Sequence, residues 1–243
     1  MGPSAIPILM YHQVDARPAR GAAMRGLVVS PASFARQMGL LKALGYQGLS
    51  MAGLMPYLRG HKEGKVFGVT FDDGYANNLE HAMPVLQKHG FSATCYMVSS
   101  QLGGTNVWDH SKGIAAKPLM NAAQASAWVA GGQEVGAHTR SHVDLRPLST
   151  AQAADEITGC KAELEDACGA VVNQFCYPYG YFNPTLAAQV QRAGYVAATT
   201  TVRGRSTRHD ALWALPRVPV MGSVWLPQFW RKVATRYEDQ RRG

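Results

Sequence analysis

The sequence predicts an α/β fold built on a parallel sheet, and the number of repeating units favours a barrel. Short apolar runs typical of buried strands recur along the chain, and segments with helical periodicity lie between most of them. A length of 243 residues with 47% hydrophobic content suits one domain spanning residues 1–243. No repeat, low-complexity tract or linker divides the sequence.

The expected strands are short runs rich in β-branched, aromatic and aliphatic residues. We place them at about 6–11, 46–49, 66–71, 92–98, 133–138, 172–177, 195–200 and 215–220.

The expected helices begin at capping residues and end at glycines. Ser30 is an N-cap, Pro31 takes the first helical position, and Gly45 ends the first helix. Further helices are expected near 75–89, 121–130, 149–168 and 183–193.

Two short segments carry the residue types of a divalent-metal site. Asp72 and Asp73 follow the apolar run 66–71, with Gly74 permitting a sharp exit, and His138 and His142 lie four residues apart. On a first helical turn the two imidazoles would project from one face toward one cation, and a carboxylate would complete the triad. One Asp can bind the metal while the other takes a proton, so the sequence predicts a metal-dependent hydrolase.

Together and in this order, TFDDG (70–74) and HTRSH (138–142) resemble the motifs of the polysaccharide deacetylase family, the NodB-homology domains of carbohydrate esterase family 4. The resemblance implies a deformed (β/α) barrel of about seven strands. It implies that Asp72 is the general base and that Asp73, His138 and His142 hold one divalent metal ion. Zn is the default, and Co, Ni, Fe or Mn are alternatives.

The segment Tyr177-Pro178-Tyr179-Gly180 resembles the third family motif, which implies that the Tyr179 amide holds the oxyanion. Most relatives have an Arg two residues before this Pro, whereas this chain has Cys176. Arg217, near the end of the last expected strand, is a candidate to replace it. We also group Arg217 with Pro178 and Trp108 as candidate substrate-binding residues, since Trp108 could stack on a sugar ring.

The family's Asp-Trp motif and its late Leu-x-His segment, whose His is the general acid, have no counterpart near the C-terminus. His12, at the end of the first expected strand, looks like that late motif moved to the front. This order resembles the circularly permuted deacetylases that act on poly-N-acetylglucosamine, which also lack the usual Arg. The resemblance therefore implies that His12 is the general acid.

The activity expected from these residues is hydrolysis of N-acetyl groups on an amino-sugar polymer or oligomer, with release of acetate. Two alternatives stay open: an O-acetyl esterase or small-amide or lipid-linked-sugar deacylase on the same metal site, and a non-catalytic glycan-binding module.

Composition and charge limit the partners and the cellular location that we expect. The formal charge is +8, and arginines gather in the last 41 residues, which favours peripheral contact with anionic surfaces. No nucleic-acid-binding module and no transmembrane segment are expected. The sequence as given shows no signal peptide and the four cysteines suit a reducing compartment, so we expect a cytoplasmic location, or a periplasmic or cell-envelope one if a leader was removed. Oligomeric state is not predicted.

Overall fold

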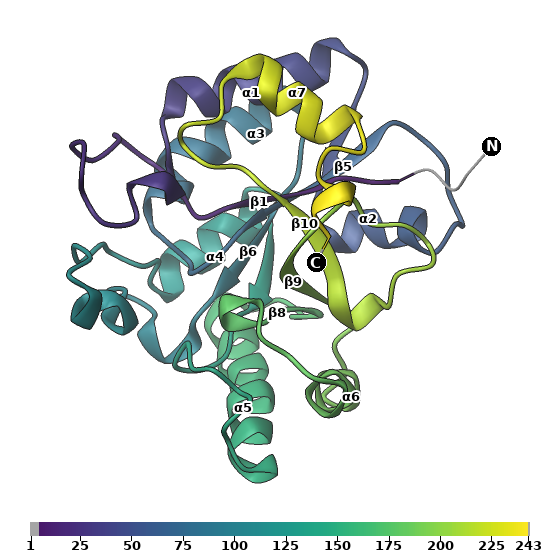
Figure 1. The fold of residues 1–243 in the computed structure, drawn as a ribbon. Helices are drawn as coiled ribbons and strands as arrows, with labels where there is room; N and C mark the ends of the chain where they lie inside the picture. The colour runs from purple at the N-terminus through teal and green to yellow at the C-terminus, as the bar shows by residue number, and fades with distance from the viewer. Residues whose placement is uncertain (1–4, 243) are drawn as a thin grey trace.

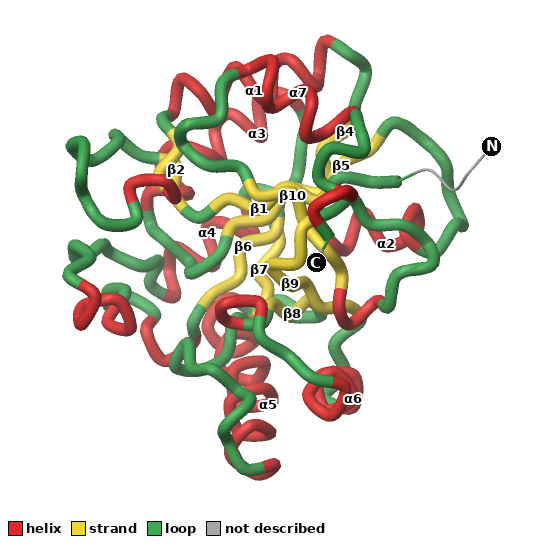
Figure 2. The backbone as a smooth tube through the Cα atoms, in the orientation of Figure 1, coloured by secondary structure: helices red, strands yellow, loops and turns green. Residues whose placement is uncertain are grey.

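The structure is a computed structural model that describes residues 5–242, and its centre is a closed ring of parallel strands. Neighbouring strands in the ring follow the order β1-β10-β9-β8-β7-β6-β5, and β5 returns to β1. Figure 2 shows these strands at the centre with helices around them. The expected fold class, a deformed barrel of seven strands, is confirmed.

Each expected strand is present; most have the expected or slightly tighter limits, whereas β9 begins later and ends three residues beyond the expected position. The ring consists of β1 (Ile8–Tyr11), β5 (Val66–Phe71), β6 (Thr94–Met97), β7 (Glu134–Ala137), β8 (Gln174–Cys176), β9 (Ala197–Arg203) and β10 (Leu215–Pro219). The eighth strand, β4 (Gln47–Leu49), pairs with the first half of β5, whose second half pairs with β6. Two further strands, β2 (Gln13–Val14) and β3 (Val28–Val29), pair outside the ring.

Helices surround the barrel (Figure 1). They are α1 (Pro31–Ala43), α2 (Met51–Leu58), α3 (Met83–His89), α4 (Ala122–Ala130), α5 (Thr150–Cys168), α6 (Pro184–Arg192) and α7 (Leu226–Ala234). The Ser30 side chain caps α1 as expected, accepting from the Ser33 N–H. Helices α2 and α7 were not predicted.

The helix expected over 75–89 is wrong in its first half. The chain first forms a turn and then a π-helical segment over Asn78–Ala82, and only then enters α3. Pro84 explains the break, because it has no N–H to donate to the preceding turn of an α-helix. The wider π turn accommodates that missing bond.

Apolar side chains fill the space between the strands and the helices. Trp128 of α4 is fully buried, packs its ring edge-on against Phe71 of β5, and donates from Nε1 to the Glu134 carbonyl. Because Phe71 directly precedes Asp72, this contact fixes the end of β5 where the acidic pair begins. No helix among the described residues is long and apolar enough to cross a bilayer. Residues 1–4, on which the expectation about a signal peptide depends, lie outside the described part.

A buried ion-pair cluster attaches the segment after α7 to the barrel. Glu238 is fully buried and accepts from Arg203 of β9 at 2.7 Å and from Lys232 of α7. Lys232 also donates to the Pro219 carbonyl at the end of β10. Burial alone would raise the pKa of Glu238, but the charges and hydrogen bonds of Arg203 and Lys232 lower it.

We expect Glu238→Gln to lower the free energy of unfolding by about 3 kcal/mol at neutral pH, because Lys232 keeps a buried charge without its counterion. A carboxyl whose folded pKa is lowered stabilises the protein above its unfolded pKa, about 4.3 for Glu, and loses that effect as the pH falls through the folded value. The difference in the free energy of unfolding between wild type and variant, measured by urea unfolding, should therefore shrink below about pH 4.3. Asp155→Asn, at an exposed pair with Arg140, is the matched control and should cost less than about 1 kcal/mol. An equal loss in both variants would contradict the cluster's role.

Candidate active site at the carboxyl ends of the strands

The polar residues singled out in the sequence gather at one end of the barrel. His12 follows β1, Asp72 follows β5, His138 follows β7, and Tyr177 follows β8. Because the strands of the ring are parallel, their carboxyl ends meet at the same end of the barrel, as in other α/β barrels. The structure thus brings together residues that are up to 165 positions apart, from His12 to Tyr177.

The Asp72-Asp73-Gly74 turn uses two consecutive left-handed residues. Asp73 has a φ of 75° and Gly74 a φ of 78°, so the chain reverses direction immediately after β5. The Asp72 amide still bonds to the Tyr11 carbonyl of β1, at 3.0 Å. Asp72 therefore stays in register with the barrel, while Asp73 is rotated toward the histidines. A left-handed Asp is uncommon and costs free energy, which is typical of a functional position.

The two histidines do not lie on a helical turn, so that expectation is wrong. Residues 138–142 form an irregular loop in which Thr139 and His142 have φ values of 64° and 59°. Glu156 of α5 holds this loop, accepting from the Arg140 and Ser141 amides at 2.9 and 3.0 Å. This loop, and not a helical turn, brings the two imidazoles together.

Asp73, His138 and His142 form a compact set of metal-ligating side chains. The Nε2 atoms of His138 and His142 lie 3.5 and 3.2 Å from Asp73 Oδ1, and all three residues are buried. His138 Nδ1 lies 2.7 Å from the Cys176 carbonyl, so Nδ1 carries a proton and Nε2 is the nitrogen that faces Asp73. Burial acts to lower the pKa of His138, but contacts with Cys176 and the nearby carboxylates raise it, so a cation at Nε2 would replace a proton there. Two imidazoles and one carboxylate are a donor set that suits a divalent metal ion and leaves positions for water and substrate. A second candidate set, Asp72, His138 and Cys176, shares His138.

Arg217 of β10 forms a bidentate ion pair with Asp72 inside the barrel. Its Nη1 and Nη2 atoms donate to the two Asp72 carboxylate oxygens at 2.6 and 2.7 Å, and both side chains are buried. Its Nε donates to the Thr200 carbonyl. Cys176, where most family members have the Arg, is small and lies 3.2 Å from Nη2, so it leaves room for the guanidinium that enters from β10.

The same contacts set the protonation states of the carboxylates. Burial raises the pKa of Asp72, but the Arg217 charge and hydrogen bonds outweigh it and lower the pKa below its usual value. Burial also acts on Asp73, yet its contacts with the two imidazoles hold its pKa well below the usual range. Burial lowers the pKa of His142, which favours the neutral form that can bind a metal. Both carboxylates are therefore ionised at neutral pH.

His12 and Tyr179 are far apart in the sequence but line the same cavity as the two carboxylates. His12 Nε2 lies 4.0 Å from Asp72 Oδ2, and Asn78 donates to the His12 carbonyl at 2.8 Å. Tyr179 has a φ of 61°, and no acceptor among residues 5–242 engages its N–H. Gly180 must be glycine, because a Cβ there would lie 2.0 Å from Thr201 Oγ1. The turn thus leaves the Tyr179 amide available to a ligand.

These residues line a cavity of about 140 Å³. Trp108 forms one wall and stacks on His142 with 4.4 Å between ring centroids. Arg217 and Pro178, expected as substrate-binding residues, are buried and do not line this cavity. Sequence reasoning missed several lining residues, because none belongs to a recognisable spacing pattern: Met24, Leu27, Asp109, Lys112 and Thr201.

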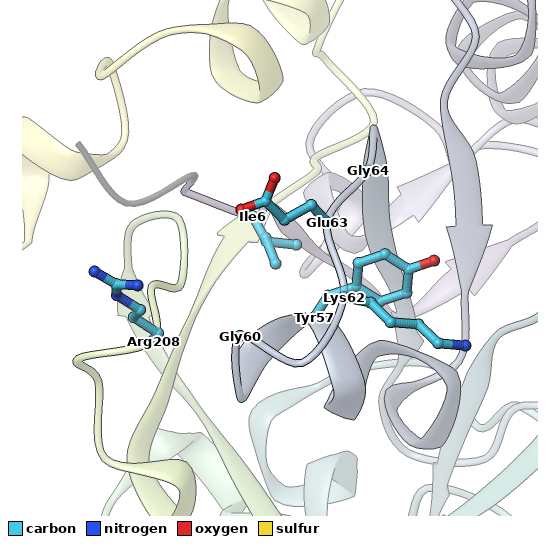
Figure 3. Close-up of a pocket in the computed structure, with 7 residues that line it drawn as sticks. All are labelled: Ile6, Tyr57, Gly60, Lys62, Glu63, Gly64 and Arg208. Atoms are coloured by element: carbon cyan, nitrogen blue, oxygen red, sulfur yellow. The ribbon is translucent and has the colours of Figure 1, made fainter. Parts of the chain in front are cut away.

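A smaller cavity of about 80 Å³ lies at the other end of the strands (Figure 3). Ile6, which precedes β1, and Gly64, which precedes β5, line it, and Arg208 reaches it from the segment between β9 and β10. None of the metal-ligating or catalytic candidates borders it. The candidate catalytic residues therefore lie away from this cavity, at the carboxyl ends of the strands.

Comparison with known proteins gives a consistent assignment. Residues 59–198 match the family model for polysaccharide deacetylase. YxkH of Bacillus subtilis, assigned to the polysaccharide deacetylases, is 30% identical over 220 residues, covering 90% of this chain and 72% of YxkH. The acetate complex of the deacetylase PplD from Streptococcus pyogenes superimposes with a TM-score of 0.82 at 25% identity, covering 95% of this chain and 99% of PplD. IcaB from Ammonifex degensii has a TM-score of 0.77 at 26% identity, covering 93% and 95% of the two chains.

The matched segment contains the acidic turn, the histidine loop and the Tyr-Pro-Tyr-Gly turn. The motifs, the barrel and the relatives thus lead to one family. This chain covers 99% of PplD and 95% of IcaB. The chain belongs to the polysaccharide deacetylase family.

Proposed function

We propose that the protein is a metal-dependent N-deacetylase that removes acetyl groups from amino sugars of an N-acetylglucosamine-type glycan. One observation carries this proposal. Asp72, ionised and paired with Arg217, lies beside the buried set of Asp73, His138 and His142. A base and an adjacent metal-ligating triad, lining one cavity, are the parts that hydrolysis of an unactivated amide requires.

Asp73 Oδ1, His138 Nε2 and His142 Nε2 would hold the divalent ion. When bound, such an ion lowers the pKa of its water toward about 7 and polarises a carbonyl. Asp72 accepts the proton of the attacking water. Arg217 fixes both Asp72 oxygens, so the carboxylate keeps one orientation and stays deprotonated before the reaction.

The remaining residues act on the carbonyl oxygen and the leaving group. The Tyr179 amide donates to the oxygen that becomes negative as water adds to the carbonyl carbon. His12, on the same side as Asp72, donates a proton to the sugar nitrogen as the carbon–nitrogen bond breaks. The products are acetate and a free amino sugar. Trp108 and Tyr179 offer aromatic faces at the cavity for a sugar ring.

Metal titration tests the ligand set. We expect one divalent ion per chain after reconstitution. His142→Gln should weaken Zn²⁺ affinity at least about 10- to 100-fold, because losing a residue that only orients a metal ligand already costs that much. The measurement is competition with a chromophoric chelator. Cys176→Ser is the matched control, because Cys176 belongs only to the second candidate set. Affinity lost in Cys176→Ser and kept in His142→Gln would reassign the site.

Acetate release tests the reaction. Metal-loaded protein should release acetate from N-acetylglucosamine oligomers, and Asp72→Asn should lower kcat about 10²- to 10⁴-fold, because the amide cannot accept the proton. The variant should still bind the metal, since Asp73 supplies the carboxylate ligand. Acetate release at the wild-type rate by Asp72→Asn would remove Asp72 from the mechanism, and a metal-loaded protein that releases none from any oligomer would redirect the search to esters and small amides.

Leaving-group dependence tests His12. An amine must be protonated to depart, whereas the phenolate of an aryl acetate leaves without a proton. We therefore expect His12→Ala to lower kcat about 10²- to 10⁴-fold on the N-acetyl substrate and to leave aryl acetate hydrolysis within a few-fold of wild type. Equal losses on both substrates would show that His12 does not act as the general acid.

A further inference from the structure

One side of the molecule combines exposed apolar residues with an excess of positive charge. Helices α1 and α7 lie side by side on this side of the barrel (Figure 1). Between them is a shallow groove of about 450 Å³ lined by Leu40, Leu44, Leu226, Pro227 and Trp230. We call these residues, with Trp225 at the start of α7, the α1–α7 face.

The apolar side chains of this face are unusually accessible. Trp225 is 67% exposed, Leu44 39% and Trp230 36%, although Trp230 also packs edge-on against Tyr46. Exposed tryptophan beside aliphatic residues is typical of surfaces that meet a membrane interface or a protein partner. Leu40 and Leu226 also pack against the core, which α7 contacts mainly through Phe229 and Val233, whereas the more exposed Leu44, Trp225 and Trp230 do not belong to it.

The charged residues around the α1–α7 face indicate which kind of partner it can bind. Residues 16–62, which include α1, contain no Asp or Glu, and neither do residues 211–237, which include α7. Arg36 lies one turn before Leu40 on α1, and Arg231 lies one turn after Pro227 on α7. Both residues are exposed, and the Arg231 guanidinium lies over the Tyr237 ring, 4.2 Å from its centroid. The first carboxylate after α7, Glu238, is buried and paired with Arg203 and Lys232. The rim of the face is therefore cationic.

We propose that the α1–α7 face binds an anionic phospholipid bilayer surface. Arg36 and Arg231 contact lipid phosphates, while Trp225 and Trp230 enter the headgroup region. A second copy of the chain is a poorer partner, because it would place two cationic rims against each other. No spanning helix is required for such peripheral binding.

The position of the face places the active site near the lipid. Trp225 follows the loop after β10, at the carboxyl end of the barrel, and the Gly222 amide of that loop bonds to the Gly26 carbonyl at 2.7 Å. Met24 and Leu27, on either side of Gly26, line the catalytic cavity. A protein docked through this face therefore presents its cavity beside the membrane surface.

Vesicle sedimentation tests the proposal. We expect the wild-type protein to bind phosphatidylcholine vesicles that contain phosphatidylglycerol and to bind pure phosphatidylcholine vesicles weakly. Binding should fall at about 1 M salt, where the Debye length is about 3 Å. Arg231→Gln should weaken binding about fivefold, the effect of removing one surface cation, and Trp225→Ala should weaken it further at every salt concentration.

The matched control is Arg192→Gln on α6, an exposed cation away from this face, which should leave vesicle binding unchanged if the α1–α7 face is the contact. Equal weakening by Arg192→Gln and Arg231→Gln would overturn the proposal, as would equal binding to neutral and anionic vesicles. A dimer by light scattering that Trp225→Ala dissociates would also overturn it, by identifying a second copy as the occupant. Vesicle binding does not depend on catalysis, and Trp225→Ala should keep its acetate release from soluble oligomers, so failure here is distinct from failure of the proposed activity.

Discussion

The buried ion pair between Arg217 and Asp72 is the contact on which the organisation of the site depends. A guanidinium without partners would be very costly inside a barrel, so every donor direction needs an acceptor. Here Nε reaches the Thr200 carbonyl, Nη1 reaches Thr70 Oγ1 and Asp72, and Nη2 reaches Asp72 and the Cys176 thiol. One side chain thereby ties β10, β9 and β5 together and fixes the carboxylate at the end of β5.

Backbone strain is concentrated around this contact. All five non-glycine residues with positive φ in the described chain lie in or beside the site: Asp73, Thr139, His142, Tyr179 and Met24, which lines the cavity. Each such conformation costs of the order of 1–3 kcal/mol and persists only where surrounding contacts enforce it. Glu156 supplies those contacts for the histidine loop, and Thr201 supplies them for Tyr179 by donating to its carbonyl. A helix outside the barrel and a strand of the ring thus hold these residues in conformations that the local sequence would not adopt.

This division explains what the sequence could and could not predict. Strand positions and most helix limits follow from local patterns, such as the apolar run 66–71 and the Ser30 cap, because burial and capping act over a few residues. The histidine loop was misread as a helical turn, because its shape depends on Glu156, which lies outside the motif. The lining residues Asp109 and Lys112 were missed because they belong to no recognisable spacing pattern. Arg217 was detectable only as a candidate, since nothing local distinguishes a guanidinium that reaches Asp72 from one that meets substrate.

Closure of the ring also accounts for the position of His12, the proposed general acid, at the start of the chain. β1 lies between β5 and β10 and pairs with both, so the first strand occupies a place that a strand following β10 could equally fill. The register Tyr11↔Phe71 puts His12 beside Asp72, whatever number of residues separates them in sequence. In a closed barrel the neighbours of a residue are set by strand order around the ring and not by order along the chain. A histidine moved from the last strand to the first therefore keeps its position relative to the base, provided that the strand carrying it still pairs with β5.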